Sequence, residues 1–414
     1  MTLSPLSPPP LPRLLSQRMF IRLWLTRVMA TAGLQMLVLS IGWLMYDLTR
    51  DAWDLGLIGI YQFLPALVMT LPAGQAVDRF HRGAILSACV ALQAVTAGVL
   101  LYASLRGGIS RELLLGAAIA VGVARAFQSP AQQALIAVLV PRALMPRATA
   151  MSSGGGQAAN MLGPAIGGLL LIFGPFAVFL CCLGLQVLGL GLGLSLRYKH
   201  NPDAREPVTL VSLLAGVRFV LGHRMILGAL SLDLFAVLLG GATALLPMFA
   251  RDILMVDSAG LGLLRAAPAL GALAMSLVLS RFSLDRHIGF KLTGAVATYA
   301  LAMLVFGLSA YFALSMAALI LSGCADMVSA VIRHTLVQME TPDAMRGRVG
   351  AVNAIFISAS NQLGEFESGA TASWLGPVGS VLMGSAATLC LVLVWLRVFP
   401  DLVRRDRFEN PSNL

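Results

Sequence analysis

The chain has 414 residues, of which 58% are hydrophobic and only 12% are charged. Soluble domains carry roughly 25% charged residues, so these values exclude a soluble globular protein and a disordered one. The formal net charge is +10; in so apolar a chain it indicates basic residues in the cytoplasmic loops of a membrane protein, and no nucleic-acid partner is expected.

Twelve apolar stretches follow one another along the chain, each suited to a membrane-spanning helix of about 20 residues. They lie at residues 24–46, 55–77, 84–105, 112–138, 148–171, 175–196, 226–249, 259–280, 288–309, 313–339, 348–372 and 376–398. The apolar runs are continuous, whereas the strands of a membrane barrel would alternate apolar and polar residues. We therefore predict an all-α membrane protein with twelve transmembrane helices.

A polar link divides these stretches into two groups of six. We predict bundles at residues 20–197 and 225–399, joined by a cytoplasmic linker at residues 198–224. Val208, Val211, Leu214 and Val217 in this linker suggest a short amphipathic helix at the membrane surface, a plain linker being the alternative. The proline-rich residues 1–19 are expected to be a disordered tail, and residues 400–414 a second tail.

The distribution of basic residues predicts the orientation of the chain in the plasma membrane. About twenty lysines and arginines lie on the side of the two termini. The opposite side carries only Arg50, Arg106, Arg111 and Arg251. Because positive charge collects in cytoplasmic loops, both termini are expected in the cytoplasm.

The two halves of the chain repeat each other at a constant offset of 201 residues. Gly122 corresponds to Gly323, and Pro141 to Pro342; the segment Asn160-Met161-Leu162-Gly163 corresponds to Asn361-Gln362-Leu363-Gly364. The match runs without gaps over about 45 residues. It predicts two six-helix bundles related by a pseudo-twofold axis along the membrane normal.

Three motifs resemble those of the major facilitator superfamily. The segment Gly74-Gln75-Ala76-Val77-Asp78-Arg79-Phe80-His81-Arg82 is similar to its loop signature, in which Gly74, Asp78, Arg79 and Arg82 match. Arg125-Ala126-Phe127-Gln128 resembles the element of its fourth helix, and Gly163-Pro164-Ala165-Ile166-Gly167-Gly168 resembles the antiporter signature of its fifth.

Other segments are similar to one subgroup, the twelve-helix exporters of enterobactin and macrolides. They are Trp43-Leu44-Met45-Tyr46-Asp47-Leu48-Thr49, Gly122-Val123-Ala124-Arg125-Ala126-Phe127 and Thr341-Pro342-Asp343-Ala344-Met345-Arg346-Gly347-Arg348-Val349. Leu34 stands where that subgroup commonly has an aspartate. The resemblance implies a monomeric transporter with the major facilitator fold.

Two of the motifs have an expected mechanical role. Asp78 and Arg79, at a cytoplasmic helix end, are expected to hold that side shut by a contact that breaks on opening; a solvated loop that only sets orientation is the alternative. Gly163 and Pro164 are expected to kink their helix, while Gly167 and Gly168 allow a neighbouring backbone to approach closely.

Charged and amide side chains inside the predicted helices are candidates for the transport site. A charge in the bilayer costs about 2.5–3.5 kcal/mol, so such residues are expected to pair or to line a cavity. The candidates are Arg125, Asp326, Glu365, Asp233, Arg27, Asn160, Asn361 and Gln128. Arg125 and Asp326 are equivalent in the repeat, and Glu365 is equivalent to Pro164.

Asp326 and Glu365 are the two residues that we select as protonatable groups in or beside a central cavity. Fixed ion pairs between helices are the alternative for both. For Arg27 and Asp233 the alternative is a position near a helix end.

These observations predict proton-coupled export of an amphipathic small molecule, siderophore-like or drug-like, by alternating access. A lysolipid transporter of the same fold is the runner-up, and a membrane-embedded enzyme is a third reading with little support. No nucleotide-binding motif is found, and cysteine and histidine are scattered without ligand spacing, so neither a cofactor nor a metal is expected. The expected partners are the substrate, protons and the lipid bilayer.

Overall fold

The structure is a computed structural model that describes residue 14 and residues 17–196, 210–282, 284 and 286–408. The first bundle consists of α1 (Arg18–Thr49), α2 (Ala52–Arg79), α3 (Arg82–Arg106), α4 (Arg111–Leu139), α5 (Met145–Leu171) and α6 (Pro175–Leu194), with the short 3₁₀ turn η2 (Arg142–Leu144) before α5. The second bundle consists of α8 (Arg224–Leu239), η3 (Ala242–Leu245), α9 (Leu246–Met248), η4 (Phe249–Ile253), α10 (Ser258–Leu279), α11 (Ile288–Leu308), α12 (Phe312–Glu340) and α13 (Asp343–Val398). No strand occurs in the described ranges, which confirms the predicted all-α membrane fold.

The twelve predicted helices are all found, with one pair joined. Ten helical segments of the described chain are long and apolar enough to cross a membrane. One of them, Met345–Val398, lies within α13, which is 56 residues long and bends at Gly376, where φ is 73°. Glycine is needed there because other residues rarely adopt a positive φ. Counting the two arms of α13 separately, and adding α5 with its 27 residues, gives twelve.

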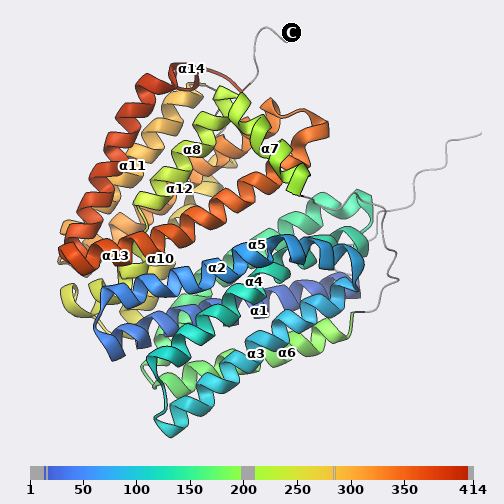
Figure 1. Ribbon diagram of the computed structural model, residues 1–414, viewed down its shortest axis with the longest axis vertical. Helices are drawn as coiled ribbons and strands as arrows, with labels where there is room; N and C mark the ends of the chain where they lie inside the picture. The colour runs from blue at the N-terminus through green and yellow to red at the C-terminus, as the bar shows by residue number, and fades with distance from the viewer. Residues whose placement is uncertain (1–13, 15–16, 197–209, 283, 285, 409–414) are drawn as a thin grey trace, which may run out of the picture.

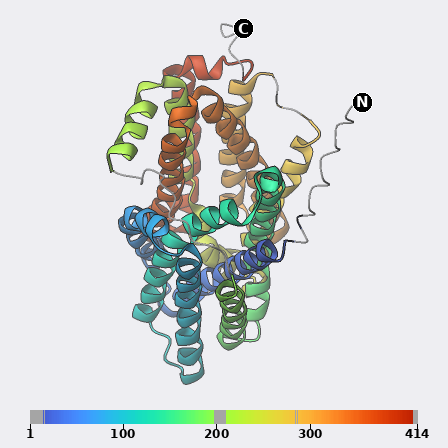
Figure 2. The same cartoon turned by 90° about the vertical axis from the view of Figure 1, so that its right-hand side faces the viewer.

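The two bundles lie against each other (Figures 1 and 2) and diverge toward one end (Figure 1). We name the two ends of the molecule by the turns found there. The turn between α1 and α2 marks the Arg50 end, and the turn between α2 and α3 marks the Arg79 end. In Figure 1 the bundles meet at the Arg50 end and separate toward the Arg79 end.

Glycines allow the bundles to touch. A Cβ atom added to Gly168 of α5 would lie 2.8 Å from the Cα of Gly262 in α10. A Cβ atom added to Gly369 of α13 would lie 2.9 Å from the carbonyl oxygen of Ala52 in α2, beside Gly56. Gly168 and Gly369 are related by the 201-residue offset. The two interfaces between the bundles are therefore equivalent under the pseudo-twofold axis.

The linker region contains a helix, α7 (Leu210–Gly222), which packs on the second bundle. Val220 is buried in one cluster with Val349 and Val352 of α13. A Cβ atom on Gly216 would lie 2.9 Å from the carbonyl oxygen of Arg348, so α7 lies directly on the start of α13. The remaining linker residues 198–209 lie outside the described chain.

The predicted tails lie mostly outside the described residues, but both are shorter than expected. Helix α1 already begins at Arg18, and a short helix α14 occupies Pro400–Val403. Leu402 of α14 is buried in a cluster of the second bundle. These residues were expected to be tail and instead belong to the folded protein.

Candidate functional site

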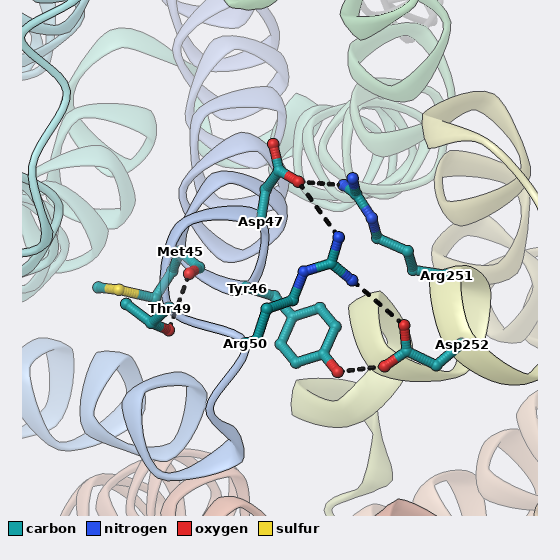
Figure 3. A network of polar contacts seen from close by, with 7 residues as sticks. All are labelled: Met45, Tyr46, Asp47, Thr49, Arg50, Arg251 and Asp252. Atoms are coloured by element: carbon teal, nitrogen blue, oxygen red, sulfur yellow. Dashed lines mark hydrogen bonds and ion pairs between the residues drawn. The ribbon is translucent and has the colours of Figure 1, made fainter.

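A network of charged residues joins the bundles at the Arg50 end (Figure 3). Asp47 near the end of α1 forms an ion pair with Arg251 of η4. Arg50 lies 3.8 Å from Asp47 and 3.3 Å from Asp252 of η4. The hydroxyl of Tyr46 donates a hydrogen bond to Asp252. Two positive and two negative side chains thus alternate across the boundary between the halves.

The backbone on both sides of this network is irregular. Arg50 caps α1 in the left-handed conformation, with φ 53°, which glycine usually adopts at a helix end. On the other side, η4 is a π-helix, a form that often occurs at functional sites. The guanidinium of Arg251 also lies over the ring of Trp43, 5.2 Å from its centroid.

A second group of charges lies deeper, between the bundles. Arg125 of α4 and Arg265 of α10 both interact electrostatically with Glu365 of α13. Arg125 comes from the first bundle, and Arg265 and Glu365 come from the second. The three charges therefore lie on both sides of the boundary, near the middle of the membrane-spanning helices.

Amide side chains hold Arg125 on the side of the first bundle. Its guanidinium donates hydrogen bonds to Gln62 and to Gln35, each at 3.4 Å. Gln35 in turn donates to Asn160 of α5 at 3.1 Å. Asn160 thus belongs to the network around Arg125. A cavity of about 130 Å³, lined by Arg125, Gln62 and residues of α13, adjoins the network.

Asp326 lies in a different place from Arg125. It lines a cavity of about 310 Å³ that extends into the second bundle among α8, α10, α11 and α12. Asn361 and Gln157 also line this cavity. Asp326 interacts electrostatically with Tyr299 of α11. Glu365, rather than the repeat-equivalent Asp326, is the acidic residue whose charge acts on Arg125.

Three other candidate residues form an ion pair or a hydrogen bond within their own bundle. Asp233 forms an ion pair with Arg333 of α12, both side chains being largely buried. The guanidinium of Arg27 donates to the hydroxyl of Ser152 at 2.6 Å. Gln128, which is itself buried, accepts a hydrogen bond from Gln93 of α3 at 2.6 Å, so it faces α3. These contacts occupy each of the three side chains within its own bundle, and a role in transport stays a prediction for them.

The loop signature lies at the Arg79 end. Arg79 is exposed, while Arg82 is buried and its Nε atom donates to the carbonyl oxygen of Val77 at 3.4 Å. A Cβ atom on Gly74 would meet nothing within 4 Å. The side chain of Asp78 lies outside the described part. The proposed contact of Asp78 and Arg79 with the other half thus stays a prediction.

The glycines of the fifth-helix motif face two partners. Gly163 and Gly167 pack against α1, where added Cβ atoms would lie 2.9 Å from the Cβ of Gln35 and 3.1 Å from the Cα of Met36. Gly168 faces α10 instead, and the carbonyl of Pro164 lies close to Gly262. The motif therefore fixes α5 between its own bundle and the opposite one.

Comparison with known proteins identifies the family of this chain. The pattern of the transmembrane secretion effector family (MFS_3) matches residues 5–411. The chain belongs to this family of the major facilitator superfamily. It is 27% identical over 399 residues to the enterobactin exporter EntS of Shigella boydii serotype 18, covering 95% of this chain and 94% of that protein. The same values hold for enterobactin exporter EntS of Escherichia coli O1:K1 / APEC.

Solved structures share the fold at low sequence identity. A mutant of the nucleoside transporter NupG has a TM-score of 0.72 and 14% identity, covering 92% of this chain and 100% of that chain. A bacterial homologue of the iron transporter ferroportin, in an inward-facing state, has a TM-score of 0.69 and 16% identity, covering 95% of this chain and 100% of the other. These structures show the fold alone; the family model and the similarity to the enterobactin exporters show a secondary transporter of the enterobactin exporter-like subgroup and a multi-pass inner membrane protein rather than an enzyme.

The sequence prediction missed the network at the Arg50 end. Its four charged residues lie at helix ends, whereas the predicted site residues lie inside the apolar stretches. One signal was present, because the dipeptide Arg50-Asp51 recurs as Arg251-Asp252 at the same offset of 201 residues.

Proposed function

We propose that this transporter exports an amphipathic small molecule in exchange for protons, by alternating access of a central cavity. The observation that carries the proposal is the group formed by Arg125, Arg265 and Glu365. These three charges come from both bundles and act on one another between them. Charges at this depth are retained mainly where they serve transport.

Protonation of Glu365 changes the force between the bundles. When Glu365 is ionised, its negative charge attracts Arg125 across the boundary and offsets the repulsion between Arg125 and Arg265. When Glu365 is protonated, that repulsion is no longer offset. In a medium of low dielectric constant this change is larger than it would be in water. Proton binding therefore favours separation of the bundles in the middle of the protein.

The driving force for this exchange comes from the membrane itself. Inward movement of one charge supplies about 2.3 kcal/mol per 100 mV. We place the Arg79 end and both termini in the cytoplasm, following the distribution of basic residues. In this orientation the bundles diverge toward the cytoplasm, and a substrate enters the cavities lined by Arg125 and by Asp326 from that side.

The similarity to the enterobactin exporters favours a siderophore-like substrate, and both cavities combine polar and apolar linings. Asp326 is the second proposed protonatable group, because it lines the larger cavity and the structure gives it no ion-pair partner among the described residues. Asn361 lines the same cavity. The substrate and the proton would then compete for one carboxylate.

Transport in proteoliposomes tests the proposal. Purified protein is reconstituted with a pH-sensitive dye inside, and a catecholate siderophore or a macrolide is added under an imposed pH gradient. We expect substrate-dependent proton movement that falls at least about tenfold in Glu365→Gln, because the amide cannot carry a proton.

Glu367→Gln is the matched control, since Glu367 is two residues away on the same helix and its carboxylate accepts a hydrogen bond from the hydroxyl of the adjacent Ser368 at 3.5 Å. Unchanged proton-linked transport in Glu365→Gln and in Asp326→Asn would contradict the proposed coupling. Movement of lysolipid across the bilayer without proton flux would favour the lipid transporter instead.

A further inference from the structure

The repeat places identical dipeptides at equivalent ends of the two bundles. Arg50-Asp51 follows α1, and Arg251-Asp252 lies in η4 at the end of the segment that begins with α8. A pseudo-twofold axis relates these two positions. In an interface of this symmetry, each arginine is expected to meet the aspartate of the other half.

Only one of these two reciprocal contacts is made. Arg50 pairs with Asp252 at 3.3 Å. Asp51 is instead the N-cap of α2, where its carboxylate accepts a hydrogen bond from the backbone of Trp53 at 2.9 Å. Arg251 therefore forms its ion pair with Asp47 of α1, which lies four residues before Asp51 in the sequence. The symmetry is broken so that each arginine still has an acidic partner on the opposite half.

We propose that Asp47, Arg50, Arg251 and Asp252 form a gate that closes the Arg50 end and opens during transport, which we name the Arg50-end gate. This inference rests on the proposed alternating access. All four side chains are partly exposed, by 32% to 50%. Water replaces the partner of an exposed charge easily, so each pair contributes little and the contact is readily reversible.

A nearby ion pair shows what a permanent contact looks like at the same end. Asp54 of α2 is almost fully buried and accepts two hydrogen bonds from Arg111 of α4, from Nε at 2.8 Å and from the terminal nitrogen at 2.5 Å. Both residues belong to the first bundle. This pair stays intact when the bundles move apart, whereas the pairs of the Arg50-end gate have to break.

The backbone conformations support a gate rather than a chance contact. Arg50 holds the left-handed position where glycine would cost less, and η4 keeps the π form. The left-handed conformation costs Arg50 free energy, and π-turns occur frequently at functional sites. The π-turn and the left-handed cap direct the charged side chains of both halves toward each other (Figure 3).

Charge reversal tests the gate in the full-length protein. Spin labels are placed on cysteines at Arg106 and Tyr311, two exposed positions on opposite bundles at the Arg50 end, in a chain whose native cysteines are replaced by alanine. The distances between labels are measured in lipid nanodiscs by double electron–electron resonance. We expect Asp252→Arg to raise the ratio of long to short distances about tenfold, since an attraction becomes a repulsion.

The double variant Arg50→Asp with Asp252→Arg restores opposite charges and is expected to return the distribution to that of the parent. Asp54→Asn is the matched control and leaves the distribution unchanged. An unchanged distribution in Asp252→Arg, or a folded double variant that stays open, would overturn the gate. This distance readout needs no substrate or proton gradient, so the gate and the proton-coupled export can fail independently.

Discussion

Replacing Gly168 by alanine is expected to shift the conformational equilibrium without disrupting either bundle. The added methyl group would lie 2.8 Å from the Cα and 2.9 Å from the backbone nitrogen of Gly262, both of which are backbone atoms. The optimal separation between non-bonded carbon atoms is about 3.5–4.0 Å. Helices α5 and α10 would therefore have to move apart by several tenths of an ångström or more.

The size of this effect follows from the cost of overpacking. Extra methyl groups in a tightly packed site typically cost about 1–3 kcal/mol. This cost arises only when α5 and α10 are in contact, because the two helices belong to different bundles. Conformations in which the bundles separate at the Arg50 end do not carry this free-energy cost. The ratio of open to closed molecules is therefore expected to rise about 5- to 150-fold.

The same distance measurement between labels at positions 106 and 311 serves as the assay. Gly154→Ala is the control, because Gly154 lies on the same helix and an added Cβ atom there would meet nothing within 4 Å. Both substitutions stabilise their helix by up to about 1 kcal/mol, because alanine has a higher helix propensity than glycine. This contribution therefore cancels in the comparison. If the two alanine variants give the same distance distribution, the close contact between α5 and α10 does not control opening.

Two further outcomes are expected. Raising the ionic strength from about 0.05 M to about 0.5 M should lengthen the distance between the same labels, because the exposed charges of the Arg50-end gate are screened. A variant with Asp47→Asn and Asp252→Asn should lose this lengthening. If the parent protein and this variant respond equally to salt, the result argues against the gate. Arg333→Leu should destabilise the second bundle by about 3–5 kcal/mol in thermal unfolding, because it leaves the buried carboxylate of Asp233 without its ion-pair partner. The double variant Arg333→Leu with Asp233→Leu should recover most of this lost stability. If it recovers none, the loss came from packing alone.

The helices and their arrangement could be predicted from the sequence because both depend on local or repeated patterns. Hydropathy identified all twelve helices, although it did not show that α13 continues through Gly376 as one bent helix. The 201-residue repeat predicted two equivalent bundles, and Gly168 and Gly369 indeed occupy equivalent interfaces. A glycine that allows a close approach in one half serves the same purpose in the other.

The pairing of the charges could not be predicted in this way. The repeat identifies equivalent positions, but equivalent positions lie on opposite sides of the axis and meet only if both are close to it. Arg125 and Asp326 are equivalent, yet Asp326 lines a cavity inside the second bundle while Glu365 acts on Arg125. Gln128 lies one turn beyond Arg125 but contacts α3. Side-chain direction is a property of the packed bundle, which composition does not reveal.

The contrast between the glycines and the charges bears on how the halves work together. Gly168 and Gly369 follow the repeat, and each allows the two bundles to approach closely at one of the two interfaces. Charges depart from it, because two identical halves would bring like charges together at equivalent positions near the axis. Glu365 where the first half has Pro164, and Asp47 as the partner of Arg251 in place of Asp51, both give an arginine an acidic group across the boundary. The places where the two halves differ are thus those where the proposed function puts a switch in the attraction between them, a proton at Glu365 in the middle and water at the Arg50-end gate.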